Sequence, residues 1–250
     1  MKVAVVTGGS SGIGAALARR LRDHGYHCVL VARGRERLER VAAELDAEAD
    51  VCDVGDRAAV EALAARVGER HAALRLLVNN AGIPGRATFL EAGAELVEEV
   101  IRTNYLGGVW CLKAFLPLLE AGAPSTVVNV VSVAGTVSGG PSGPYTASKH
   151  AQIAFSRAIT PELEARGIGV LTVNPGLTHT DGFPQDRFLR HRYARHTVVT
   201  AEKVADAIVD GLRHRRSEVF VPGYYRIAST LSALAPVTVA RLASRRAPGA

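Results

Sequence analysis

Thr7-Gly8-Gly9-Ser10-Ser11-Gly12-Ile13-Gly14 lies between an apolar run, Val3–Thr7, and a segment that carries apolar residues at helical spacing, Ser11–His24. Glycine lets the backbone turn tightly and approach a ligand closely, and the start of a helix offers free N–H groups to an anion. A glycine-rich loop can also be a simple turn, but its place between a strand and a helix favours a phosphate-binding loop. We therefore expect a dinucleotide pyrophosphate to contact Gly8, Ser10, Ser11, Gly12, Ile13 and Gly14.

Short apolar runs alternate with longer helical patterns as far as about residue 221. The apolar runs predict strands at Val3–Thr7, His27–Ala32, Leu74–Asn79, Thr126–Ser132, Gly169–Asn174 and Glu218–Val221, with a weaker strand at Ala49–Cys52. Helices are predicted at Ser11–His24, Arg35–Asp46, Arg57–Ala73, Ala94–Ala121, Tyr145–Arg166 and Ala201–Arg215. This alternation indicates an α/β fold with a doubly wound, Rossmann-type parallel sheet. We expect one domain over residues 1–222, and a helical extension of the same domain over residues 223–250.

The composition is that of an ordinary globular chain, with 250 residues of which 48% are hydrophobic and 22% charged. No run approaches the roughly 18 apolar residues of a membrane span, and the first residues do not resemble an export signal, so a cytoplasmic location is expected. Cys28, Cys52 and Cys111 are scattered among apolar residues, which favours buried thiols, and no metal site is expected. The net charge of +6 comes mainly from arginines spread along the chain, which argues against nucleic-acid binding.

The end of the second predicted strand indicates the choice of nicotinamide cofactor. An NAD site usually places Asp or Glu there, to bind the ribose hydroxyl groups. Here the sequence is Val31-Ala32-Arg33-Gly34-Arg35, which contains no carboxylate. Arg33, with or without help from Arg35, suits a 2′-phosphate, so NADP (NADPH) is favoured. The alternative is that both arginines only begin a surface helix.

Tyr145-Thr146-Ala147-Ser148-Lys149 places a phenol and an ammonium group four residues apart, on one face of a predicted helix. A cation beside a phenol favours the phenolate, so we expect Lys149 to lower the pKa of Tyr145 towards neutrality. A phenol tuned in this way suits general acid–base catalysis. Such pairs also arise by chance on exposed helices, so the prediction depends on its context.

Together with the glycine loop, the chain resembles the short-chain dehydrogenase/reductase family to about residue 222. The matching pieces follow the order and spacing of the family, with Ser132 placed 13 residues before Tyr145. They are Thr7–Gly14, Asp53-Val54, Asn79-Asn80-Ala81-Gly82, Asn104, Ser132, Tyr145 with Lys149, and Pro175-Gly176. Jointly these pieces are very specific, although each alone would not be.

The resemblance implies a role for each matching residue. Tyr145 would be the general acid or base, Lys149 would tune Tyr145 and hold the nicotinamide ribose, and Ser132 would orient the substrate oxygen, unless Ser132 only caps a strand end. Asn104 would help a water chain to resupply the proton; its alternative is to bend its helix. The remaining cofactor contacts would come from Asp53, Val54, Asn80, Ala81, Gly82, Pro175, Gly176 and Thr178. Asn79 and Asn80 could instead tie the central strands together, and Thr180 is an equal alternative to Thr178.

These observations favour an NADPH-dependent oxidoreductase that reduces a ketone or aldehyde, or oxidises the alcohol with NADP+. The alternative is a catalytically silent NADP-binding regulatory protein on the same fold, against which the presence of Ser132, Tyr145 and Lys149 argues. A sugar-nucleotide epimerase is disfavoured by the short chain and by the Gly-x3-Gly-x-Gly spacing. The substrate is expected to be a small carbonyl compound or alcohol.

Two segments are expected to determine specificity and association. Residues 178–200 resemble the family's substrate-closing segment, and Arg187, Arg190, Arg192 and Arg195 either face solvent or bind an anionic substrate. Residues 223–250 are expected to cover the pocket or dock on a partner subunit, to make a peripheral membrane contact through Leu231–Leu242, or to be a loosely ordered end; Pro236 interrupts the apolar segment. A homodimer or homotetramer is expected, paired through the long helices 94–121 and 145–166.

Overall fold

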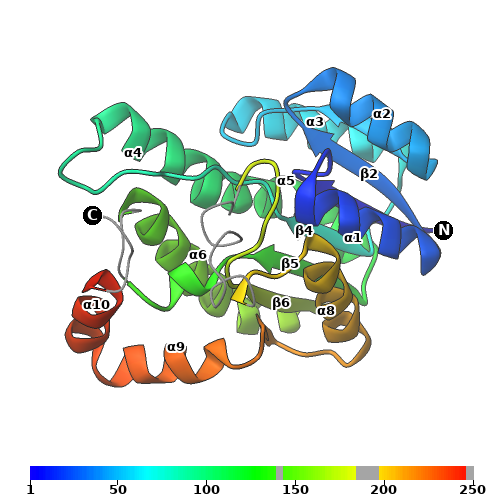
Figure 1. Cartoon of the computed structure of the whole chain (residues 1–250). Helices are drawn as coiled ribbons and strands as arrows, with labels where there is room; N and C mark the ends of the chain where they lie inside the picture. Colours follow the sequence, from blue (N-terminus) through cyan, green and yellow to red (C-terminus); the bar gives the residue numbers. More distant parts are fainter. Residues whose placement is uncertain (139–142, 184–196, 246–250) are drawn as a thin grey trace.

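The computed structural model describes residues 1–138, 143–183 and 197–245. A sheet runs through the centre of the molecule (Figure 1). Its strands are all parallel, in the order β3-β2-β1-β4-β5-β6-β7. The strands are β1 (Lys2–Thr7), β2 (Tyr26–Ala32), β3 (Glu48–Val51), β4 (Leu76–Asn79), β5 (Ser125–Val130), β6 (Ile168–Pro175) and β7 (Glu218–Val221). The predicted doubly wound Rossmann-type sheet is confirmed, including its weaker third strand.

Helices cover both faces of the sheet, because successive strand residues are apolar and point to opposite sides. One buried cluster joins the sheet to α1, α2 and α8, and the other joins it to α3, α5 and α6. The helices are α1 (Gly12–Asp23), α2 (Arg35–Leu45), α3 (Arg57–Arg70), α4 (Ala94–Ile101), α5 (Gly107–Ala121), α6 (Gly143–Glu164), α8 (Ala201–Arg213), α9 (Tyr225–Leu234) and α10 (Pro236–Arg245). All three cysteines are free and buried, as the sequence predicted.

The single helix predicted for residues 94–121 is wrong in one respect. α4 and α5 are joined by a π-helical turn, Arg102–Leu106. Asn104 lies within this turn, and its side chain bonds to the backbone of Ile83 and to Ser148 instead of facing solvent. A wider turn is a recognised way to aim a side chain from within a helix. Periodicity cannot detect such a turn, because one inserted residue barely alters the apolar pattern.

The C-terminal extension forms two helices beyond β7, and the break between them falls at Pro236, which is the first residue of α10. Proline suits that position because its missing N–H would have no helical partner there. Tyr225 anchors the extension, since a Cβ atom on Gly176 would lie 2.2 Å from Cε2 of its ring. The extension exposes large apolar side chains at Tyr224, Ile227, Leu231, Leu234, Val237 and Leu242.

No helix in the described ranges is long and apolar enough to cross a membrane. Arg187, Arg190, Arg192 and Arg195 lie outside the described residues, so the two interpretations of their charge stay as stated.

The expected homo-oligomer stays a prediction, and α5 and α6 offer the surface for it. Partly buried apolar side chains on these helices include Trp110, Leu116, Phe155 and Ile159. Light scattering should give a mass of two or four times 26.4 kDa. Ile159→Lys should lower that mass, because a lysine would place a charge in the interface, whereas Leu90→Lys, at a fully exposed leucine ahead of α4, should leave it unchanged. A single-chain mass at micromolar concentration would refute pairing.

Candidate active site

The glycine loop between β1 and α1 is shaped to receive a ligand's phosphates. Gly8 has a positive φ of 67°, and a Cβ atom on Gly14 would lie 2.2 Å from the carbonyl oxygen of Gly8. Ser11 begins α1 with extended backbone, and its side chain makes no capping hydrogen bond within the described part of the chain. The first N–H groups of α1 are therefore not capped by a side chain, which fits a pyrophosphate at this helix end.

The glycine loop is held in place by Asn80, which directly follows β4, a neighbour of β1 in the sheet. The Nδ2 of Asn80 donates to the carbonyl oxygens of Thr7, at 2.9 Å, and Gly8, at 3.3 Å. The side chain of Asn80 thus ties the ends of two central strands together, which was the alternative to a direct cofactor contact. Ala81 and Gly82 continue along the same edge, and Gly82 lies beside Asn104 and Lys149.

An open cleft of about 870 Å³ lies at the carboxyl ends of β2 and β3 and includes Arg33 and Asp53 in its lining. Nη1 of Arg33 lies 3.9 Å from a carboxylate oxygen of Asp53 and from one of Glu99. Asp53 accepts from the backbone N–H of Gly55 at 2.9 Å, while Val54 is buried behind it. The cleft therefore holds the half-exposed guanidinium of Arg33 beside the carboxylates of Asp53 and Glu99. The sequence analysis expected the ribose next to the adenine at this place.

Two other arginines of this region differ in their surroundings. Arg35 pairs with Glu39 along the exposed side of α2 and does not point to the glycine loop. Arg37, which the sequence analysis did not single out, donates from Nε to the carbonyl oxygen of Ser10 at 3.1 Å and pairs with Asp181. Arg37 thus links the glycine loop to the segment after β6. Its helical position resembles that of any surface arginine, so no sequence signal could have found it.

Ser132, Tyr145 and Lys149 come together where β5 and α6 meet. Ser132 follows β5, donates from Oγ to the carbonyl of Pro175 at 3.4 Å, and lies close enough to Tyr145 to oppose the rise of its pKa. It also accepts from the N–H of Ala134 at 3.1 Å, so it caps a short 3-10 turn as well. Nζ of Lys149 lies 5.6 Å from the centre of the Tyr145 ring. The hydroxyl of Ser132, the phenol of Tyr145 and the amine of Lys149 therefore lie close together. They lie at the carboxyl end of the sheet, where the glycine loop also lies.

The expected lowering of the tyrosine pKa is wrong in this structure. Burial raises the pKa of Tyr145 to about 12, with the Ser132 hydrogen bond opposing it, and burial lowers the pKa of Lys149 to about 7. Both shifts disfavour the charged form, as desolvation does. Nζ of Lys149 donates to Oε1 of Gln152 at 2.7 Å, a buried partner that the sequence analysis did not identify.

Asn104 is buried and held in one orientation. Its Oδ1 accepts from the N–H of Ile83 at 2.8 Å, and its Nδ2 donates to the Ile83 carbonyl at 3.1 Å and to Oγ of Ser148 at 3.0 Å. Ser148 in turn donates to the carbonyl of Tyr145 at 2.7 Å. Asn104 is thus connected to the first turn of α6, and its predicted part in proton supply stays a prediction.

The segment after β6 closes on the glycine loop and on Tyr145. Thr178 is buried and donates to the carbonyl of Gly176 at 3.2 Å. Thr180 lies against the glycine loop, because a Cβ atom on Gly12 would approach its side chain to 2.9 Å. The ring of Phe183 lies 5.7 Å from that of Tyr145, centre to centre. Phe183 is therefore a neighbour of Tyr145 that the spacing of residues in the sequence did not reveal.

Known proteins resemble the chain over most of its length. A family model described as short chain dehydrogenase matches residues 2–187. A putative ketoacyl reductase of Streptomyces coelicolor is 37% identical over 215 residues, which cover 83% of this chain and 81% of the relative. A short-chain dehydrogenase/reductase from Burkholderia phymatum in complex with NAD has a TM-score of 0.84 at 26% identity, covering 96% of this chain and 95% of the other. Actinorhodin polyketide ketoreductase with NADPH has a TM-score of 0.80 at 31% identity, covering 90% and 97%.

The family match, the long alignment and the shared sheet agree with the residue pattern from which the resemblance was first argued. Together they identify an oxidoreductase of this fold that uses a nicotinamide cofactor. The chain belongs to the short-chain dehydrogenase/reductase family.

Proposed function

We propose that the chain is an NADP(H)-dependent ketoreductase that interconverts a ketone or aldehyde and the alcohol, with Tyr145 as general acid and base. The observation that carries the proposal is the meeting of Ser132, Tyr145 and Lys149 at the sheet edge that holds the glycine loop. Similarity to the putative ketoacyl reductase of Streptomyces coelicolor and to actinorhodin polyketide ketoreductase supports a carbonyl substrate. A nicotinamide bound on Gly8–Gly14 would supply the hydride.

The chain's own residues manage the proton. With a pKa of about 12, the phenol of Tyr145 keeps its proton at neutral pH and can donate it to the oxygen of a carbonyl substrate. Ser132 can hold the same oxygen, since its hydroxyl already lies within hydrogen-bonding reach of the phenol. In the oxidative direction the tyrosine must first lose its own proton to solvent before it can accept the proton of the alcohol, and a cationic Lys149 beside its ring would stabilise that phenolate.

The preference for NADP rests on Arg33, and known proteins of similar fold carry either cofactor. Arg33 has 55% of its side chain exposed in the cleft, and its two carboxylate neighbours lie at 3.9 Å, too far for direct hydrogen bonds. A 2′-phosphate would offer the guanidinium a closer, doubly bonded partner.

Mixing the protein with NADPH and a panel of carbonyl compounds tests the proposal, since oxidation of the cofactor changes its absorbance. Consumption of NADPH that depends on the carbonyl compound supports a reductase. Tight NADPH binding without turnover on any compound would favour the silent regulatory protein instead.

Replacing Tyr145 by Phe should lower kcat by about 10²–10⁴-fold, which is the usual contribution of general acid–base catalysis. Cofactor affinity should stay close to normal, because only one hydroxyl group is removed. Steady-state kinetics and NADPH titration measure the two effects separately. Tyr26→Phe removes a hydroxyl on β2 and serves as the control. A Tyr145 variant that retains more than half of the normal kcat would rule out the assigned role.

Replacing Arg33 by Asp should weaken NADPH binding far more than NADH binding. A carboxylate would repel the 2′-phosphate and could accept hydrogen bonds from the ribose hydroxyl groups. Fluorescence titration with both cofactors gives the ratio of the two Kd values. Arg35→Ala is the matched control, because its guanidinium pairs with Glu39 on the surface. An unchanged ratio in the Arg33 variant would dismiss Arg33 as the selector.

Replacing Gly14 by Ala should abolish cofactor binding and lower stability, because the added Cβ would lie 2.2 Å from the Gly8 carbonyl oxygen and 2.7 Å from Nδ2 of Asn80. Gly68→Ala is the control within a helix, since its Cβ would meet only Leu118 at 3.9 Å. That change should raise stability by about 0.5–1 kcal/mol. Thermal melts with and without NADPH distinguish the two variants, and similar melts for both would contradict the loop geometry.

A further inference from the structure

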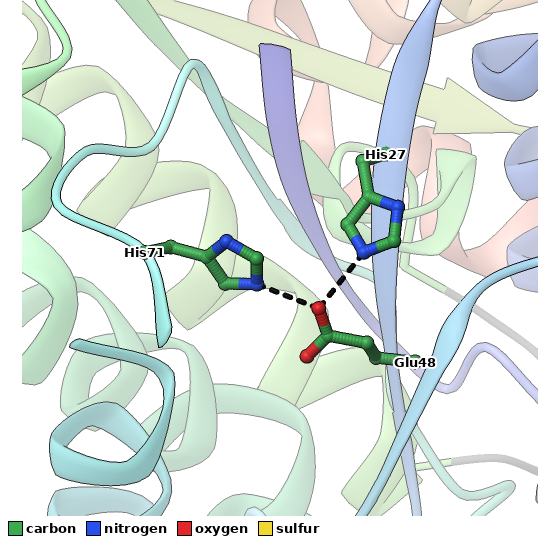
Figure 2. Close-up of side chains that lie close together, drawn as sticks. All are labelled: His27, Glu48 and His71. Atoms are coloured by element: carbon green, nitrogen blue, oxygen red, sulfur yellow. Dashed lines mark hydrogen bonds and ion pairs between the residues drawn. The ribbon is translucent and has the colours of Figure 1, made fainter. Parts of the chain in front are cut away.

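Three polar side chains converge at the amino-terminal end of the sheet, away from the catalytic residues. His27 lies near the start of β2, Glu48 begins β3, and His71 directly follows α3. The Nε2 atoms of His27 and His71 lie 2.8 and 2.7 Å from the same atom, Oε1 of Glu48. Figure 2 shows both rings pointing at this oxygen. One nitrogen from each histidine and one glutamate oxygen therefore lie within 4.8 Å of one another.

The fold brings the three together in a defined way. Glu48 pairs with Val29, and His27 lies two residues before Val29, so His27 and Glu48 share the face of the sheet that α3 covers. α3 ends at Arg70, and the extended backbone of His71 brings its ring back to the sheet. The side chain of His71 is only 7% exposed, while those of His27 and Glu48 are 27% exposed. His71 is thus held inside the protein, while His27 and Glu48 remain accessible to small solutes.

Glu48 is held by a second set of contacts. Its other oxygen, Oε2, accepts from Nε of Arg70 at 2.7 Å. Arg70 also pairs with Asp50, which Arg66 contacts at 3.1 Å. These contacts fix the carboxylate so that Oε1 faces the two imidazoles, and they balance the two negative charges with two positive ones. Fixed outer partners of this kind orient ligands in metal sites.

The donor set suits a borderline transition metal. Two imidazole nitrogens and one carboxylate oxygen are a known zinc ligand set, with a fourth position left for water. Mg²⁺ and Ca²⁺ would require more oxygen ligands. With bonds of about 2.0–2.1 Å, tetrahedral ligand atoms lie about 3.3 Å apart, so Oε1 must withdraw by about 0.5 Å from each nitrogen. A small rotation of the partly exposed Glu48 side chain that keeps Oε2 on Arg70 allows Oε1 to move by that amount.

We propose that His27, Glu48 and His71 bind one Zn²⁺ ion, with water as the fourth ligand. On binding, each Nε2 gives its lone pair to the metal and each ring keeps one proton on Nδ1, while any further proton is released to solvent. The ion joins β2, the edge strand β3 and the end of α3. The site lies at the opposite end of β2 from Arg33, so the ion would be held away from the cofactor cleft.

Zinc binding is measured on tag-free protein that has been stripped with a chelator and dialysed. Titration with ZnCl2 should give one ion per chain by calorimetry and by elemental analysis. At 100-fold excess over Kd, Tm should rise by about 5–10 °C, whereas MgCl2 should leave it unchanged. CoCl2 should give the intense visible bands of a four-coordinate ion. Absence of bound zinc, or a cobalt spectrum typical of six-coordinate aqueous ions, overturns the proposal.

Variants locate the ion. His71→Ala and Glu48→Gln should each weaken Zn²⁺ binding by at least about 100-fold, which exceeds the usual effect of losing an outer partner. Glu48→Gln keeps the side chain's shape and remains informative if His71→Ala fails to fold. The control is His24→Ala, which removes an exposed histidine bonded to the carbonyl of Arg20. NADPH-dependent turnover should be unchanged in Glu48→Gln without zinc. Zinc retained by both cluster variants, or lost in His24→Ala, places the ion elsewhere and overturns the proposal.

Discussion

The hydroxyl group of Thr7 fixes the distance between the two strands on which the cofactor loop depends. It donates to the carbonyl oxygen of Val78 at 3.0 Å, and it accepts from the N–H groups of Asn80 and Ala81 at 3.0 and 3.1 Å. A hydroxyl offers one proton and two lone pairs, so all its capacity is used. β1 and β4 are thereby joined where both strands end. The Asn80 amide can then reach the Gly8 carbonyl, and the tight contact between Gly8 and Gly14 follows from that anchoring.

A second buried chain of hydrogen bonds positions the helix that carries the catalytic pair. Asn79 on β4 donates to Asn129 on β5 at 2.9 Å, and Asn129 donates to Ser156 on α6 at 2.9 Å. The hydroxyl groups of Ser156 and of Thr172 on β6 form a hydrogen bond of 2.7 Å. These bonds lie in the low-dielectric interior, where a missing partner is costly, so they specify one placement of α6 against three strands. Tyr145 and Lys149 lie about three and two turns before Ser156 in the same helix, so that placement positions them as well.

The sequence predicts the sheet, the glycine loop and the Tyr145–Lys149 pair because each has a local signature: continuous apolar runs that alternate with helical periodicity, a glycine spacing, or an offset of four. The π-helical turn at Asn104, the Gln152 bond to Lys149 and the Arg37 contact with Ser10 have none, since they arise from packing between distant segments. The tyrosine pKa was predicted in the wrong direction for a related reason. Spacing reveals a neighbouring cation but not the depth at which both groups are buried, and here burial dominates. The histidine cluster was likewise invisible, because His27, Glu48 and His71 come from separate elements.

Parallel strands place their carboxyl ends on one edge of the sheet, so the residues with chemical roles gather there and leave the other edge free. At that free edge the short strand β3 directs Glu48 and Asp50 towards α3, where the neighbouring strands present valines. Apolar packing cannot hold the start of β3, and ion pairs with Arg66 and Arg70 take its place. Asp50 is buried and Glu48 partly buried, so solvent screens these pairs less than it screens exposed ones. β3 leads within two residues to Asp53, beside Arg33 in the cleft. The contacts of both histidines with Glu48 therefore restrict the start of β3. The other end of β3 leads to the cleft expected to hold the cofactor.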